Sequence, residues 1–239
     1  MTWSIVAYDQ CAGAFGAVAA TQAFAAGTFV PFVRSGAGAV GTQSITNRYL
    51  AHATLDGLER GLPAQLALDA ALAGDEGREI RQLHCVDREG RIAAWTGKHC
   101  VGWAGGIGEP FVSVAGNMLA NDRVAAAALA GFKAAAGQPL PERLMAGMEA
   151  SEAAGGDRRG RRSAAMVMTT TEDFPDLSLR VDDHADPMAE LRRLLTIWRE
   201  ERAPYLGNSP SKANPAGVHD IDVIEAGWIA RGWDIRFTR

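Results

Sequence analysis

The order in which strands and helices are predicted constrains the fold of this chain more than any other feature. The chain opens with strands, and groups of helices and strands then follow without the regular strand–helix–strand repeat of a parallel sheet. Runs of β-branched, aromatic and small apolar residues predict strands over residues 3–9, 14–21, 27–34, 39–44, 79–87, 91–96, 111–119, 163–170, 176–181 and 232–237. The order therefore favours an α+β fold with mainly antiparallel sheets.

Predicted helices separate these groups of strands. Leu50, Leu55 and Leu58 share one side of the first helix. Asp186 followed by Pro187 is typical of a helix start, with an N-cap and a proline in the first turn. Helices are predicted over residues 48–60, 63–72, 122–136, 141–154, 187–202 and 221–231.

The chain length of 239 residues is typical of one domain with a tail. The helix that begins at Pro187 is predicted to end near residue 202, and a loop rich in Pro, Gly, Asn and Ser follows it. We therefore expect one domain over residues 1–202 and a C-terminal extension, residues 203–239, packed on it.

Charge and cysteine content limit the classes of function. The net charge of -4 argues against binding the phosphate backbone of nucleic acids, because such proteins carry a basic surplus. The three cysteines, Cys11, Cys85 and Cys100, are odd in number and lack CxxC spacing, which fits a reducing compartment.

No secretory signal or membrane-spanning stretch is recognised, so we expect a cytoplasmic protein that binds neither nucleic acid nor membrane. Six tryptophans and many alanines are compatible with homo-oligomers.

Residues 36–41 match the G-x-G-x-x-G pattern of dinucleotide-binding loops, and Glu59 lies about 20 residues further on. A dinucleotide site needs a helix to begin at the last glycine, but residues 42–46 are β-prone. We therefore interpret the glycines as a tight corner between two strands, and we expect no cofactor.

Histidine and cysteine are adjacent at 84–85 and again at 99–100, and residues 182–186 form an acidic run with one histidine. Adjacent residues of a strand point to opposite faces, so neither pair can ligate a metal ion with both members without a bend. The acidic run precedes a predicted helix and is interpreted as its cap. We therefore expect no metal site.

Residues 155–162, Gly-Gly-Asp-Arg-Arg-Gly-Arg-Arg, place one acidic residue beside four arginines after a predicted helix. The glycines are expected to end that helix. Two interpretations of the arginines stay open. One is a solvated loop, and the other is a clamp whose guanidinium groups grip a carboxylate or another planar anion.

Thr2 follows the initiator methionine, and removal of Met1 would leave Thr2 with a free α-amine at the head of a buried strand. A threonine hydroxyl beside its own α-amine combines nucleophile and base in one residue. The ordinary pKa of an α-amine, about 7.7 to 8.0, suits a base near neutral pH. Many chains begin with Met-Thr without this chemistry, so the N-terminus alone leaves the question open.

Five segments together resemble the family known as domain of unknown function 1028. They lie at residues 2–9, 41–44, 116–120, 155–165 and 179–187. The Gly-Gly-Asp-Arg-Arg-Gly and Arg-Val-Asp-Asp-His blocks are long enough to be specific together. The resemblance, which covers about residues 1–202, implies the N-terminal-nucleophile hydrolase group. It therefore also implies a four-layer αββα sandwich of two mainly antiparallel sheets between helical layers.

The usual chemistry of that group is amide hydrolysis by an N-terminal Thr, Ser or Cys, which implies a small-molecule amidohydrolase. Thr2 is the expected nucleophile, Ser4 the next hydroxyl on the same strand face, and Asn117 the donor to the oxyanion. The expected substrate-binding residues are Arg34, Gln43, Asp157 and Arg158. The alternative is a non-catalytic ligand-binding or assembly module that recognises an acidic metabolite through the arginine-rich loop.

Overall fold

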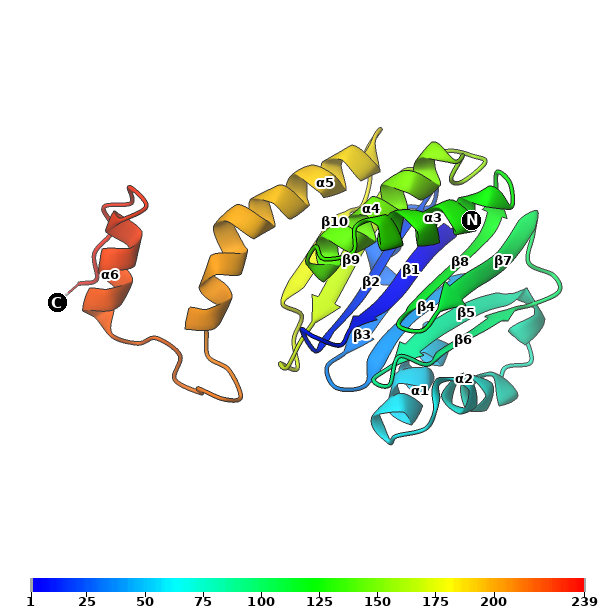
Figure 1. Cartoon of the computed structure of the whole chain (residues 1–239), viewed down its shortest axis with the longest axis horizontal. Coiled ribbons are helices and arrows are strands. Elements are labelled where there is room, and N and C mark those ends of the chain that lie inside the picture. Colours follow the sequence, from blue (N-terminus) through cyan, green and yellow to red (C-terminus); the bar gives the residue numbers. More distant parts are fainter. Residues whose placement is uncertain (1, 239) are drawn as a thin grey trace. The chain divides into compact units, whose positions relative to one another are not determined.

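The computed structural model describes residues 2–238 of the chain (Figure 1), and the predicted removal of Met1 lies outside that range. The chain divides into two compact units, one that ends at Thr196 and one that begins at Ile197. The predicted packing of residues 203–239 on the main domain stays a prediction. Among residues 2–238, none of the helices combines the length and the apolar character needed to cross a membrane.

The larger sheet of the first unit has six antiparallel strands in the order β10-β9-β2-β1-β8-β7. Its strands are β1 (Thr2–Asp9), β2 (Ala14–Thr21), β7 (Trp103–Glu109), β8 (Val112–Leu119), β9 (Ser163–Thr169) and β10 (Leu177–Val181). The predicted turn after β1 is stabilised by Asp9, whose carboxylate accepts backbone hydrogen bonds from Cys11 at 3.1 Å and Ala12 at 3.2 Å. In this strand order β1 lies inside the sheet, with β2 on one side and β8 on the other.

The smaller sheet has four antiparallel strands in the order β3-β4-β5-β6. Its strands are β3 (Pro31–Arg34), β4 (Gly38–Ser44), β5 (Arg81–Asp87) and β6 (Ile92–Thr96). The glycine-rich segment forms the β3–β4 hairpin, in which Gly36 has a φ of 68°. The interpretation as a tight corner between two strands is therefore confirmed.

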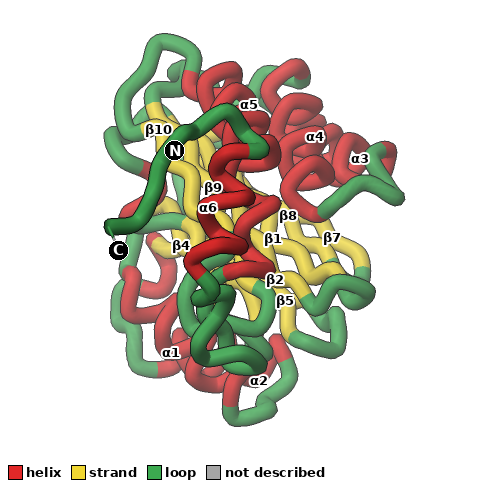
Figure 2. Tube along the Cα trace, turned by 90° about the vertical axis from the view of Figure 1, so that its left-hand side faces the viewer, coloured by secondary structure: helices red, strands yellow, loops and turns green. Residues whose placement is uncertain are grey.

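Two pairs of helices enclose the two sheets (Figures 1 and 2). Helices α3 (Arg123–Ala134) and α4 (Leu140–Ala153) pack on the six-stranded sheet. Helices α1 (Arg48–Glu59) and α2 (Ala64–Ala73) pack on the four-stranded sheet. The inner faces of the sheets meet through β1 and β8 on one side and β4 and β5 on the other. The first unit is thus an α+β fold with two antiparallel sheets, as the order of elements predicted.

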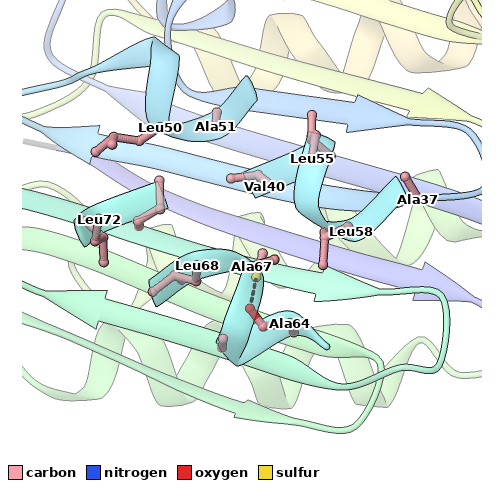
Figure 3. Packing of buried hydrophobic residues seen from close by; sticks show 13 residues of the cluster. Ala37, Val40, Leu50, Ala51, Leu55, Leu58, Ala64, Ala67, Leu68 and Leu72 are labelled. Atoms are coloured by element: carbon pink, nitrogen blue, oxygen red, sulfur yellow. Dashed lines mark hydrogen bonds between the residues drawn. The ribbon is translucent and has the colours of Figure 1, made fainter. Parts of the chain in front are cut away.

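Leucine and alanine side chains of α1 and α2 fill the space against the four-stranded sheet (Figure 3). Leu50, Leu55 and Leu58, which were predicted to share one side of a helix, are all buried there. Each fully buried leucine contributes about 1.5–3 kcal/mol. Hydrophobic burial therefore holds this helix pair on the sheet.

Helix α5 (Pro187–Ile197) buries Leu191 and Leu195, and Arg192 forms ion pairs with Glu149 at 2.8 Å and with Glu142, both in α4. The helix was predicted to run to residue 202. Its α-helical part ends at Ile197, and residues 198–202 continue as a π-helical turn. The predicted start at Pro187 is confirmed.

One strand was missed and two strand predictions were wrong. Strand β7 was not predicted, because its glycines lower strand propensity. A Cβ at Gly106 would lie 2.7 Å from the carbonyl oxygen of Val114, so glycine at this position permits the close approach of β8. The strand expected over 27–34 begins only at Pro31, after a short 3-10 helix. Residues 232–237 form no strand, and the Phe237 amide instead donates to the Glu225 carboxylate at 2.7 Å.

The second unit contains helix α6 (Ile221–Ile229). The Asp220 side chain caps this helix by accepting backbone hydrogen bonds from Asp222 and Val223. The Arg231 guanidinium lies 3.6 Å from the centre of the Tyr205 ring, a cation–π contact. This unit is held together locally, by contacts among its own residues.

Candidate functional site

The alternation of side chains along β1 divides it into a helix-facing and a sheet-facing row. Ile5 faces α4, because a Cβ at Gly147 would lie 2.6 Å from its Cδ1 atom. Ser4 faces the other sheet, where it contacts Gln43 and His84. Thr2 belongs to the row of Ser4, so its side chain lies on the side of β1 between the sheets, where it is only 3% exposed.

Thr2 is the first residue of β1 and lies between two polar neighbours. Its Cα pairs with that of Thr21 in β2 and with that of Asn117 in β8. The Thr2 hydroxyl donates to the Thr21 hydroxyl oxygen at 3.2 Å. The three side chains are buried, so this end of the sheet holds a polar group of residues within an apolar core.

Asp157 lies across the strand end at which Thr2 begins. It forms an isolated β-bridge with Leu119 at the end of β8, and its carboxylate accepts from the amide of Gln22 at 3.2 Å, directly after β2. The same carboxylate accepts from the amide of Arg159 at 2.8 Å. Because β2 and β8 flank β1, these contacts place a buried carboxylate over the start of β1.

A buried network connects this end of the six-stranded sheet to the four-stranded sheet, and Gln82 of β5 is its centre. The Gln82 Nε2 group donates to the carbonyl oxygen of Gly116 at 2.8 Å. The Gln82 Oε1 atom accepts from Gln43 Nε2 at 2.8 Å and from Asn117 Nδ2 at 3.0 Å. Gln82 is fully buried, so it fixes β8 beside Thr2 from the opposite sheet.

The Gly116 carbonyl also fixes the direction of the hydrogen bonds in this network. A carbonyl can only accept, so Gln82 Nε2 must face it and Gln82 Oε1 must face Gln43 and Asn117. Gln43 Oε1 then lies 2.8 Å from Ser4 Oγ and accepts the hydroxyl proton of Ser4. One N–H of the Asn117 amide is used by Gln82, and the second remains for another acceptor.

The same reasoning fixes the tautomer of His84. Since the Ser4 proton is directed to Gln43, the Ser4 oxygen at 2.8 Å must accept from His84 Nε2–H. His84 Nδ1, without a proton, then accepts from the Ser113 hydroxyl at 3.1 Å. His84 therefore donates to Ser4 and cannot act as its base, although a Ser–His contact suggests a nucleophile at first sight.

Burial lowers the pKa of His84 to about 3, because the charged imidazolium loses its hydration. His84 in the unfolded chain, with its ordinary pKa near 6.5, takes up a proton below that pH, whereas the folded protein does not. Protonation therefore favours the unfolded chain, and stability is lost as the pH falls from 6.5 towards 3.

We expect His84 to cost the folded protein about 3 kcal/mol of unfolding free energy between pH 7 and pH 4. The measurement is urea unfolding at both pH values for the wild type, His84→Gln and His99→Gln. The exposed His99 is the matched control. His84→Gln should show the smaller loss, and an equal loss in all three proteins would contradict the low pKa.

The three other predicted substrate-binding residues lie in three different places. Gln43 belongs to the buried network. Arg158 is exposed beside Asp157 and makes no ion pair within residues 2–238. Arg34 pairs with Gly38 at the opposite end of β4 from Gln43, where it forms ion pairs with Asp56 and Glu59. The structure therefore does not bring Arg34 together with Thr2.

The arginine-rich loop is largely neutralised by its own surroundings. Arg159 pairs with Asp157 at 3.3 Å, Arg162 pairs with Asp183 at 2.7 Å, and Arg161 pairs with Glu152. Carboxylates thus occupy three of the four guanidinium groups, which favours a structured loop over an open anion clamp.

His84 and Cys85 point apart, as the strand geometry predicted. His84 faces the six-stranded sheet, whereas Cys85 faces α2 and lies 3.7 Å from the carbonyl oxygen of Ala64. Burial raises the pKa of Cys85 to about 12, so it stays a thiol. Among residues 2–238, no three His, Cys, Asp or Glu side chains lie close enough together to hold a metal ion.

Sequence reasoning missed Gln82 and Thr21 and considered His84 only as a metal ligand. The sequence gives little indication that Gln82 and His84 belong to a site. They alternate with Leu83 and Cys85, a pattern typical of a strand with one polar, solvated face. Here both faces of β5 are buried, one against helices and one against the second sheet. Only the stacking of two sheets distinguishes these cases.

Comparison with known proteins gives one clear relationship. The model of the "Family of unknown function (DUF1028)" matches residues 2–191. The crystal structure of a DUF1028 protein from Silicibacter pomeroyi is 28% identical, with a TM-score of 0.84 over 92% of this chain and 96% of that chain. Anbu (ancestral beta-subunit) from Yersinia bercovieri is 10% identical, with a TM-score of 0.38 over 88% of this chain and 99% of that chain; no shared fold follows from that score. No curated protein matches significantly.

Proposed function

This chain belongs to the family of unknown function DUF1028, and we propose that it is a small-molecule amidohydrolase whose nucleophile is Thr2. One observation carries the proposal. Thr2 begins an inner strand, faces the space between two sheets, and is flanked by Thr21, Asn117 and the buried carboxylate of Asp157.

In the proposed reaction, the α-amine of Thr2 takes the proton of the Thr2 hydroxyl as Oγ1 attacks the carbonyl carbon of an amide. The carbonyl oxygen becomes an oxyanion and accepts the second N–H of Asn117, which Gln82 leaves unused. The C–N bond then breaks, the α-ammonium gives its proton to the leaving amine, and an ester to Thr2 remains. Water, deprotonated by the α-amine, hydrolyses that ester and restores Thr2.

The fold supports this proposal through its layers. Two antiparallel sheets face each other between helix pairs, which is compatible with the sandwich of the N-terminal-nucleophile hydrolases that the sequence resembles. In this proposal Asp157, which bridges to the end of β8, holds the α-ammonium of Thr2 between turnovers, and the exposed Arg158 meets a charged group on a substrate. A cytoplasmic location and a homo-oligomeric state are further parts of the proposal.

The test is to determine the N-terminal residue of untagged protein from its native host and to treat that protein with a β-lactone, an electrophile that acylates hydroxyl nucleophiles. We expect a chain that starts at Thr2 and one adduct per chain, located by mass spectrometry in the N-terminal peptide. A chain that retains Met1 and forms no adduct overturns the proposal. That result would favour the alternative, a non-catalytic module that binds an acidic metabolite.

A further inference from the structure

A pocket lies at the end of β1 opposite to Thr2, with a volume of about 320 Å³. It is formed by the β1–β2 turn, the β7–β8 turn and helices α3 and α4. Thr2 is the first residue of β1 and Asp9 the last, so the two ends of the strand are about 23 Å apart. The pocket is therefore distinct from the site around Thr2.

Aromatic rings from three different elements line this pocket: Tyr8, Phe111 and Phe132. The ring of Tyr8 is fixed by stacking on Phe15, with ring centres 4.3 Å apart, and lies 6.2 Å from the ring of Phe111. Flat aromatic walls favour a ligand with a flat, apolar body.

Phe111 holds its position at the cost of backbone strain. Its φ is 76°, a conformation that bulky residues avoid and that normally selects glycine. The strained conformation is maintained because the Phe111 amide donates to the Gly90 carbonyl at 2.7 Å and the Phe111 carbonyl accepts from the Tyr8 amide at 2.9 Å. The Phe111 ring is thereby held over Gly90 and beside Tyr8 at the wall of the pocket.

Arg143 of α4 provides the cationic group of the pocket. Its guanidinium lies 4.2 Å from the centre of the Phe132 ring, and its side chain is 22% exposed. It forms an ion pair with Asp9, whose nearest carboxylate oxygen is 3.7 Å away, which is too long for a hydrogen bond. Within residues 2–238, no side chain or backbone group accepts a hydrogen bond from this guanidinium.

The acidic groups of the pocket, in contrast, already have partners. Both oxygens of Glu109 accept from Lys133 Nζ, at 2.7 and 2.8 Å. One oxygen of Asp9 accepts the two backbone hydrogen bonds of the β1–β2 turn. Of the two cationic side chains of the pocket, Lys133 is thus held by Glu109, whereas the guanidinium of Arg143 keeps its N–H groups for a ligand.

We propose that this pocket binds a small organic carboxylate with a flat apolar body. The carboxylate accepts hydrogen bonds from the guanidinium of Arg143, and the apolar body lies against Tyr8 and Phe111. Planar carboxylates match the two parallel N–H groups of a guanidinium. This inference does not depend on Thr2 chemistry.

The probe is phenylacetate, with phenylacetamide as its uncharged analogue, and binding is followed by NMR on labelled full-length protein. We expect saturable shifts in the amides of residues 8–11 and 109–112 with phenylacetate, and at least about tenfold weaker binding of phenylacetamide. Arg143→Met should weaken phenylacetate binding at least about tenfold. Asp9→Asn should tighten it, because a like charge beside the carboxylate is removed.

Arg60→Met is the matched control, since Arg60 is exposed and lies outside the pocket, and it should bind like the wild type. Equal binding of phenylacetate and phenylacetamide by the wild type overturns the proposal without the need for any variant. Wild-type affinity in a folded Arg143→Met protein overturns it as well.

Discussion

Thr2→Ala protein is expected to form no adduct with the β-lactone, a loss of at least about a thousandfold in labelling rate. Alanine lacks the hydroxyl that is the nucleophile in the proposed reaction, and we expect no other side chain in that row of β1 to replace it. Ser4, the next hydroxyl in that row, directs its proton to Gln43 Oε1 at 2.8 Å and accepts from His84, so it has no base. The measurement is the time course of intact mass after addition of the lactone.

Two further variants separate the possible outcomes of this experiment. Thr171→Ala removes an exposed hydroxyl and should label like the wild type, which controls for surface acylation. Ser4→Ala keeps Thr2 and should also retain the adduct. If Thr2→Ala still labels while Ser4→Ala does not, the nucleophile is Ser4 and the proposed role of Thr2 is wrong.

Gln82→Leu is expected to lower the free energy of unfolding by about 3–5 kcal/mol, although leucine is similar in size and more apolar. The leucine leaves the Gln43 and Asn117 amide groups without their acceptor and the Gly116 carbonyl without its donor. Each buried polar group that loses its partner costs about 1–3 kcal/mol. Urea unfolding followed by circular dichroism measures the loss.

The same substitution at an exposed glutamine provides the control for Gln82. Gln138→Leu changes an exposed side chain before α4 and should alter stability by less than about 0.5 kcal/mol. A Gln82→Leu protein as stable as Gln138→Leu would mean that the network is not a continuous buried structure. In the folded Gln82→Leu protein we also expect slower labelling of Thr2, because Asn117 loses the group that orients it.

Local patterns determined most of the strands and helices of the first unit. The leucines of α1, the turn residues after β1 and the Asp-Pro start of α5 each act through contacts within a few residues of one another, so the sequence shows them directly. The glycine-rich segment was also predicted correctly as a corner between two strands. A dinucleotide site needs a helix to begin at the phosphates, and the β-prone segment after the last glycine cannot supply one. Strand β7 was missed because its glycines lower its strand propensity. They permit a close approach of β8, and that contact exists only once the two strands have paired.

The composition of the site was decided by tertiary structure. Sequence reasoning selected Thr2, Asn117 and Asp157, and the fold brings them to one end of β1 because β2 and β8 flank that strand. It also selected Arg34, which the register of the β3–β4 hairpin places at the other end of its sheet. Sequence alone gives no register, so it cannot tell which ends of distant strands meet.

The role of Gln82 depends entirely on the stacking of the two sheets. In the sequence it is one polar residue of an alternating strand, which is the pattern of a solvated face. When the second sheet covers that face, water can no longer satisfy its amide, so the amide must bond to Gln43, Asn117 and the Gly116 carbonyl. The sequence by itself thus determined which segments are strands and helices, whereas sheet stacking decided which polar side chains became a buried site, because burial forces each of them to find a partner.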